Sequence, residues 1–148
     1  MVTTTAQPEV IVLTGCPRRA RQIRLVLQPQ KVGTRQVATL DECRGSIDPS
    51  RPQLLVLDSV TTDLNWQQVC DVARTAGVPL IAIVERFDSR RWVELFKAGV
   101  LDVMSDPIPA PRLQIAVHDV FFGAGNRAIA MRNRPRRFLS GFRGWLGL

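Results

Sequence analysis

Residues 54–57 read Leu-Leu-Val-Leu and are followed directly by Asp58, which makes them the strongest strand signal in the chain. Four large apolar residues in a row suit a strand that is buried on both faces, as in a parallel sheet covered by helices. Four further stretches are also predicted strands: 10–13, 36–40, 79–84 and 100–104. The chain therefore contains five predicted strands, and Asp58 ends the third.

Helix signals alternate with these strands. Pro17 suits the first turn of a helix, where its missing N–H costs nothing, and a short helix is predicted over 41–47. Asn65 is a predicted N-cap for a helix that stops at Gly77, Ser89 is the predicted cap of the next, and Gly123 closes the last. Strands and helices in alternation, with short connections, imply a parallel sheet covered on both faces.

Composition divides the chain into three parts: a flexible N-terminus at 1–8, a domain at 9–122 and a basic extension at 123–148. The extension carries six arginines and no acid, so it accounts for +6 of the formal net charge of +7. No apolar run approaches the roughly 18 residues that cross a bilayer, and no secretory signal is recognisable. We therefore expect a cytoplasmic protein, with peripheral membrane attachment as an alternative.

In parallel α/β sheets, function lies outside the carboxyl ends of the strands. Those ends are predicted at Thr14 and Gly15, at Asp58, at Val84 and Glu85, and at Ser105 and Asp106. The single histidine, His118, falls on the last predicted helix, so no Ser-His-Asp triad or multi-histidine metal site can be drawn. Three scattered cysteines (Cys16, Cys43, Cys70) favour buried or half-buried thiols rather than a disulfide framework or a metal site.

The order of these features resembles the receiver domain of two-component response regulators across residues 9–122. The resemblance rests on Asp58 closing the third strand, on Lys-Ala-Gly-Val-Leu-Asp at 97–102, and on Asp106 followed by Pro107 after the fifth strand. It implies a flavodoxin-like (βα)5 doubly wound parallel sheet. In that family an acidic pair after the first strand and the aspartate after the third hold Mg²⁺. That aspartate accepts a phosphoryl group, which a hydroxyl after the fourth strand and a lysine after the fifth then bind.

Carried over by position, the resemblance keeps only Asp58, as the phospho-acceptor. The acidic pair falls on Thr14 and Gly15, the hydroxyl on Val84 and the lysine on Asp106. Mg²⁺ prefers carboxylate and water oxygens, and losing the lysine removes a charge-assisted contact worth about 1.5–3 kcal/mol. We therefore expect a vestigial site with no catalytic residue, no cofactor and no metal.

Two rearrangements of this site remain open. Asp58, Glu85 and Asp106 could form a different oxygen-rich cation site. Alternatively, Arg18 or Arg86 could neutralise Asp58 in a fixed ion pair that holds one conformation without phosphate. The competing interpretation is a solvated carboxylate at a strand end.

The extension combines arginines with an apolar pattern. Its predicted contact residues for a partner or membrane are Arg136, Arg137, Phe138, Leu139, Phe142, Arg143, Trp145 and Leu146. The apolar members recur at helical spacing on one face. This pattern suits docking on a partner protein, an anionic membrane surface, self-packing or a homodimer, or nucleic acid, in that order of preference.

Trp66 and Trp92 are expected to pack at edges of the domain, with Trp92 and Phe96 as alternative interface residues. His118 is expected at the surface. Together these observations predict a protein that is not an enzyme. We expect a non-catalytic, phosphorylation-independent interaction or signalling adaptor whose extension engages a partner. The alternative is a response regulator whose basic tail binds membrane or nucleic acid, with residual phosphorylation at Asp58.

Overall fold

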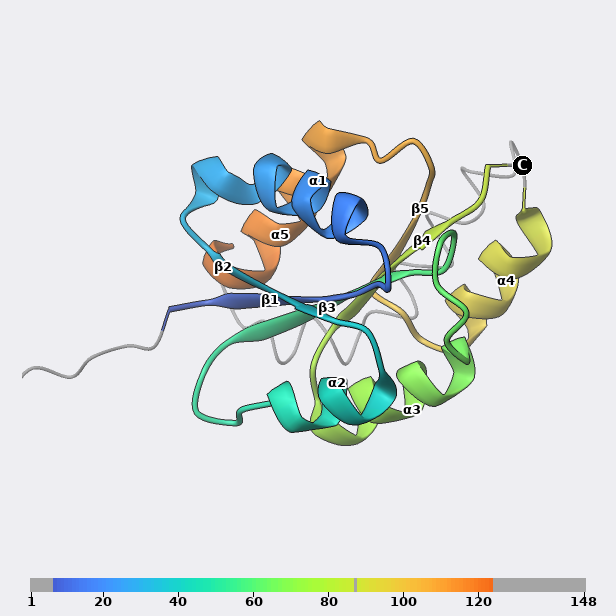
Figure 1. Ribbon diagram of the computed structural model, residues 1–148, viewed down its shortest axis with the longest axis horizontal. Helices are drawn as coiled ribbons and strands as arrows, with labels where there is room; N and C mark the ends of the chain where they lie inside the picture. Colours follow the sequence, from blue (N-terminus) through green and yellow to red (C-terminus); the bar gives the residue numbers. More distant parts are fainter. Residues whose placement is uncertain (1–6, 87, 124–148) are drawn as a thin grey trace, which may run out of the picture.

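The strand predicted around residues 54–57 lies at the centre of a five-stranded parallel sheet (Figure 1). The computed structural model describes residues 7–86 and 88–123 of the 148-residue chain. The strand order is β2-β1-β3-β4-β5, so β2 and β5 are the edges. The strands are β1 (Glu9–Leu13), β2 (Gly33–Val37), β3 (Gln53–Asp58), β4 (Leu80–Val84) and β5 (Asp102–Ser105).

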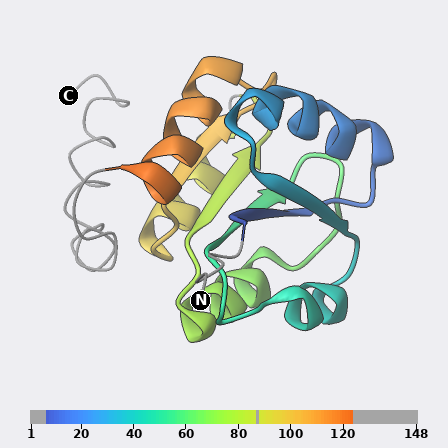
Figure 2. The same ribbon diagram turned by 90° about the vertical axis from the view of Figure 1, so that its left-hand side faces the viewer.

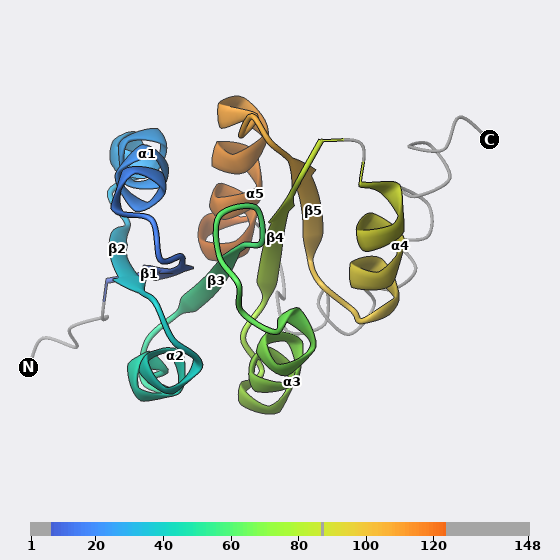
Figure 3. The same ribbon diagram turned by 45° about the vertical axis from the view of Figure 1, so that its right-hand side comes forward.

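Helices cover both faces of the sheet, as the apolar strands require. The α-helices are α1 (Pro17–Leu27), α2 (Leu40–Ser46), α3 (Trp66–Ala76), α4 (Ser89–Lys97) and α5 (Ala110–Phe122), and a 3-10 turn, η1 (Gln28–Gln30), follows α1. α1 and α5 lie on one face, and α2, α3 and α4 lie on the other (Figure 3). This is the (βα)5 doubly wound architecture that the sequence predicts.

Each face of the sheet has its own apolar core because side chains alternate along a strand. Leu54 and Val56 pack with α1 and α5, whereas Leu55 and Leu57 pack with α2, α3 and α4. By the same alternation Asp58, the residue after Leu57, turns toward the α1 side. The alternation therefore decides which helix can reach Asp58.

Several predicted helix ends are confirmed. α1 begins at Pro17, the Asn65 side chain caps α3, and Gly77 ends α3 with a φ of 70°. A left-handed φ favours glycine because it has no Cβ. The structure thus follows the local signals where they are strongest.

Other boundaries in the sequence prediction are wrong. The second strand occupies 33–37 rather than 36–40, because Thr39 and Glu42 form a capping box that starts α2. Asp88, not Ser89, caps α4, and its side chain accepts a hydrogen bond from the N–H of Arg91 at 3.0 Å. In both places a side chain accepts a hydrogen bond from a backbone N–H of the first helical turn, and this cap sets a boundary that the apolar pattern alone does not determine.

The aromatic residues divide differently from the prediction. Trp92 is 5% exposed and belongs to the core beneath α4, so it is not an edge or free interface residue. Trp66 and Phe96 are partly buried and pack against the core. His118 lies exposed on α5, as expected.

The three cysteines are free thiols. Cys43 and Cys70 are buried and Cys16 is partly exposed, which confirms the expected pattern. Burial raises the pKa of Cys43 and of Cys70 to about 11. Among the described helices, none is both long and apolar enough to cross a membrane.

Candidate functional site

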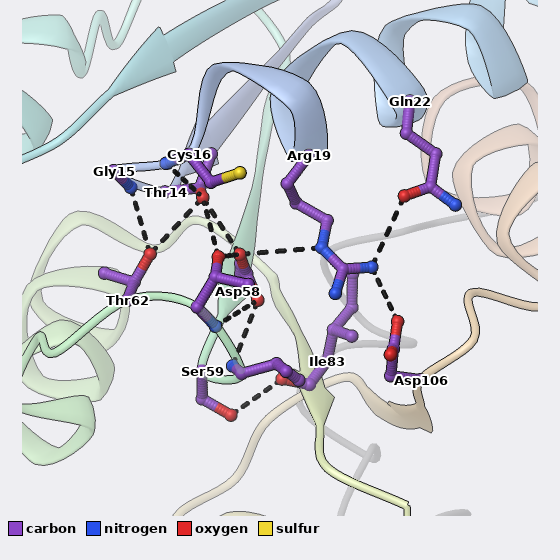
Figure 4. A network of polar contacts seen from close by, with 12 residues as sticks. Thr14, Gly15, Cys16, Arg19, Gln22, Asp58, Ser59, Thr62, Ile83 and Asp106 are labelled. Atoms are coloured by element: carbon purple, nitrogen blue, oxygen red, sulfur yellow. Dashed lines mark hydrogen bonds and ion pairs between the residues drawn. The ribbon is translucent and has the colours of Figure 1, made fainter.

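The carboxyl ends of β1 and β3 bring Thr14 and Asp58 together. Leu13 pairs with Leu57 in the sheet register, so the next residue of each strand lies side by side. The Thr14 hydroxyl donates to Oδ2 of Asp58 at 2.9 Å (Figure 4). Both side chains are fully buried, with 0% exposure. Thr14, the position predicted to lack a carboxylate, therefore donates a hydrogen bond to Asp58.

The loop after β3 binds the rest of the Asp58 carboxylate. Oδ1 accepts hydrogen bonds from the backbone N–H of Val60 at 3.0 Å and of Thr61 at 3.2 Å. The Thr61 hydroxyl donates to Oδ2, the oxygen that also accepts from Thr14. An aspartate that binds the N–H groups of the following turn is a common way to close such a turn. Each carboxylate oxygen of Asp58 thus has two hydrogen-bond donors from its own domain.

A positive charge reaches Asp58 from helix α1. Arg19 is 8% exposed, and its Nε lies 3.6 Å from Oδ2 of Asp58. Arg19, Ile23 and Leu27 are the buried residues of α1, and their spacing places them on one face of the helix. Arg19 is therefore directed inward by the register of the apolar residues that follow it.

The same guanidinium also binds Asp106, after β5. Nη1 of Arg19 lies 2.7 Å from Oδ1 of Asp106 and 3.4 Å from Oε1 of Gln22 (Figure 4). Asp106 is held in place because its N–H donates to the carbonyl of Val84 at 2.9 Å. One arginine thus bridges two aspartates from opposite sides of the site, and the Asp106–Pro107 peptide bond is cis.

This arrangement corrects the predicted cation. An arginine does pair with Asp58, but it is Arg19 rather than Arg18 or Arg86, which are both exposed. Asp106 follows β5 and pairs with the same arginine, so the positive charge beside both aspartates comes from α1. The interpretation of Asp58 as a solvated carboxylate is also wrong, because the side chain is fully buried.

The other predicted positions, Gly15 and Val84, make no hydrogen bond or ion pair with the Asp58 carboxylate within the described residues. The Gly15 N–H donates to the Thr62 hydroxyl at 3.0 Å, and the Cys16 N–H donates to the Thr14 hydroxyl at 3.0 Å. The first bond ties the loop after β1 to the loop after β3, and the second closes the turn after β1. Val84 is 1% exposed and packs in the core on the opposite face from Asp58. The hydroxyl of the neighbouring Ser59 donates to the Ile83 carbonyl at 2.7 Å.

The alternative cation site does not assemble. Glu85 is exposed, while Asp106 faces Arg19. Within the described residues, no group of three or more His, Cys, Asp or Glu side chains could hold a metal ion. The residues predicted in the extension, from Arg136 to Leu146, lie outside the described residues.

Sequence reasoning missed three residues of this site: Arg19, Thr61 and Thr62. Arg19 had a usable signal, since it precedes Ile23 and Leu27 at intervals of four on the buried face of α1. The two threonines follow Asp58 in a loop, where neither period nor cap marks them. Thr61 binds Asp58 within its own loop, whereas the role of Thr62 depends on how the loops after β1 and β3 meet.

No family profile matches the sequence, and no curated protein matches it. Solved structures do. A putative response regulator from Chloroflexus aurantiacus J-10-fl superposes with a TM-score of 0.68 and 19% identity, over 78% of this chain and 98% of the other. A signal receiver domain of a putative Luxo repressor protein from Vibrio parahaemolyticus superposes with a TM-score of 0.66 and 20% identity, over 91% of this chain and 98% of the other. A response regulator receiver protein from Pseudomonas putida superposes with a TM-score of 0.66 and 18% identity, over 78% of this chain and 99% of the other.

The chain has the fold of a response-regulator receiver domain. This confirms the resemblance drawn from Asp58, from 97–102 and from the Asp106-Pro107 pair. At such low identity the likeness concerns the fold alone. The chemistry of the receiver site has to be judged from the contacts of Asp58, Arg19 and Asp106.

Those contacts describe a closed polar cluster. A carboxylate attacks a phosphoryl group only when an oxygen is accessible and when cations offset the charge that develops at the phosphoryl oxygens. Here Asp58 is buried and accepts bonds from two hydroxyls and two N–H groups. Its one cation among the described residues, Arg19, is shared with Asp106. Both oxygens of Asp58 are therefore bound by groups of the described domain.

Proposed function

We propose that this chain is a non-catalytic pseudo-receiver, a phosphorylation-independent interaction or signalling adaptor that engages a protein partner through residues 123–148. The observation that carries the proposal is the bridge from Arg19 to both Asp58 and Asp106. In the receiver family a lysine after the fifth strand binds the phosphoryl group on the acceptor aspartate. In this chain a residue of α1 already supplies a positive charge at the equivalent aspartate.

The energetics favour a site that stays closed. Opening it would separate Arg19 from two carboxylates and leave Asp58 without its cation in a buried position. Breaking a buried ion pair by loss of one partner typically costs about 3–5 kcal/mol. A phosphodonor would have to meet that cost before reaching Asp58, without the acidic pair that holds Mg²⁺ in the family.

The first test measures phosphorylation directly. The full chain is incubated with phosphoramidate and Mg²⁺, and its intact mass is followed, with Asp58→Asn as the matched control. We expect no phosphoryl group on either protein and no change in the amide spectrum with beryllofluoride. Stoichiometric phosphorylation that disappears in Asp58→Asn would instead support a working response regulator.

The second test concerns the extension. Two full-length variants separate its charges from its apolar residues: Arg136→Glu with Arg137→Glu, and Phe138→Ala with Trp145→Ala. A protein captured by the wild type is purified, and its affinity is measured for all three chains. We expect both variants to bind it more weakly.

Co-sedimentation with phosphatidylserine vesicles distinguishes the competing membrane interpretation. The adaptor proposal expects the wild-type chain to remain in the supernatant. Vesicle binding that the arginine variant abolishes would assign the extension to a lipid surface and overturn the protein-partner proposal.

A further inference from the structure

The edge strand β2 presents backbone groups that no described residue uses. The Gly33 N–H donates to Pro8, and the Val37 carbonyl accepts from Thr14, so these two residues turn toward β1. Backbone groups alternate in direction along a strand, as the ladder of a parallel pair requires. Thr34 and Gln36 therefore direct their N–H and C=O groups away from the sheet. Among the described strands, β2 has a neighbour on one side only (Figure 2).

A groove lies between this edge and helix α1. It measures about 280 Å³ and is lined on the helix side by Pro17, Ala20, Arg21 and Arg24. Thr34 and Gln36 line it from the strand. They are in register with Val10 and Val12, whose side chains pack on the α1 face, so their side chains share that face. The groove and the unpaired backbone groups thus belong to the same two residues of β2.

The groove is basic. Arg21 and Arg24 line its helix side, its lining contains no acid, and Arg35 lines it from a strand position whose side chain shares the opposite face of the sheet with Ile11. Arg35 pairs with Glu9, Nε to Oε2 at 3.1 Å. Arg21 and Arg24 are exposed, and across 7–86 and 88–123 neither makes an ion pair or hydrogen bond. Two unpaired guanidinium groups therefore lie beside an unpaired strand edge.

We propose that the β2 edge and its groove bind an extended acidic peptide of a partner protein by strand addition. The peptide backbone bonds to Thr34 and Gln36, and acidic side chains at alternate positions meet Arg21 and Arg24. Alternate side chains on a strand are roughly 6.7 Å apart. Residues three apart on a helix rise by about 4.5 Å, a difference that flexible arginine side chains accommodate.

Charge argues against occupants from this chain. Two β2 edges meeting in a homodimer would bring the arginines of one copy against those of the other. Residues 123–148 carry six arginines and no acid, so they would be repelled as well. Nucleic acid would satisfy the arginines but would leave the directed N–H and C=O groups of the strand without a ladder. An acidic peptide satisfies both sets of groups.

The test titrates the ¹⁵N-labelled full chain with a capped peptide of about ten residues in which glutamate and threonine alternate. We expect the largest amide shifts at Thr34 and Gln36 and along the groove side of α1. A glutamate–proline peptide of equal charge serves as the control, because proline cannot donate to a ladder. Equal binding of the two peptides would overturn strand addition.

Variants separate the groove from other basic regions. Arg21→Glu with Arg24→Glu should weaken binding by roughly tenfold or more, since each pair becomes a repulsion. Arg18→Glu makes the same change on α1 outside the groove and should alter affinity less than about twofold. If the double variant binds as the wild type does, the peptide is held elsewhere, for example by 123–148, and the proposal fails.

The backbone is tested by a matched pair at one position. Gln36→Ala and Gln36→Pro both lose the side chain that donates to the Thr14 carbonyl, but only proline also removes the outward N–H. Proline is tolerated on an edge strand where its nitrogen faces outward. We expect Gln36→Ala to bind and Gln36→Pro to lose most affinity, with thermal unfolding confirming that both are folded. Equal affinity of the two, or tighter binding of oligouridine at the same amides, would overturn the proposal.

Discussion

The guanidinium of Arg19 on α1 lies 2.7 Å from the carboxylate of Asp106, which follows β5. This contact places a cation where the receiver resemblance calls for one, but the cation comes from the opposite side of the site. Because Nε of the same arginine lies 3.6 Å from Asp58, the bridge joins the ends of β3 and β5 to the first helix. Removing this bridge should therefore lower the free energy of unfolding of the whole domain.

Replacing Arg19 by Met should lower the free energy of unfolding by roughly 3 kcal/mol, because Asp58 remains buried without its cation. Arg18→Met makes the same chemical change at an exposed neighbour and should cost less than about 0.5 kcal/mol. Urea unfolding monitored by circular dichroism measures both. Similar, small effects from the two variants would show that the bridge contributes little.

Placing the cation at position 106, where the receiver resemblance puts a lysine, tests whether a cation that follows β5 can replace Arg19 beside Asp58. Asp106→Lys alone should destabilise the domain, because the new ammonium faces Arg19. Adding Arg19→Ala removes that repulsion and lets the introduced lysine approach Asp58, so the double variant should be more stable than Asp106→Lys alone. A coupling of at least about 1 kcal/mol in the unfolding cycle is expected, and strict additivity would contradict it.

The five strands and the position of Asp58 could be predicted because each rests on a local pattern. Buried strands of a parallel sheet read as apolar runs, and Asp58 interrupts one at its end. The fold class followed from the alternation of those runs with helix caps. Boundaries failed where a cap competed with an apolar pattern, as at Thr39 and Asp88.

The identity of the cation could not be decided in the same way. Arg18 and Arg19 are adjacent, and only the rotation of α1 on the sheet makes one exposed and the other buried. That rotation is set by Ile23 and Leu27, which lie on the same helix face as Arg19. Thr61 binds Asp58 three residues before it in an irregular turn, and Thr62 depends on a meeting of two loops that are distant in sequence, so no local period marks either residue.

Thr14→Val tests the hydroxyl that joins β1 to the site. This hydroxyl donates to Asp58 and accepts from the Cys16 N–H, so valine leaves the buried Asp58 carboxylate and the part-buried Cys16 N–H without one partner each. Loss of about 1–3 kcal/mol is expected in chemical denaturation. Thr75→Val, an exposed position on α3, is the matched control and should be nearly neutral. Equal effects at the two sites would show that the hydrogen bonds of the Thr14 hydroxyl contribute little to stability.

The buried thiols of Cys43 and Cys70 make the free energy of unfolding depend on pH in the alkaline range. Burial raises the pKa of Cys43 and of Cys70 from the ordinary 9.0 to about 11. Between these values the unfolded chain loses thiol protons that the folded chain keeps. The unfolded state then binds fewer protons, so the free energy of unfolding falls as pH rises through this window.

The chain has no tyrosine, whose phenol would ionise in the same window. The variant Cys43→Ala with Cys70→Ala should be less stable at neutral pH, from lost packing, yet should show a shallower decline from about pH 9 to about pH 11. Urea midpoints measured across this range decide the matter: an unchanged slope in the double variant would mean that the thiols are not the cause.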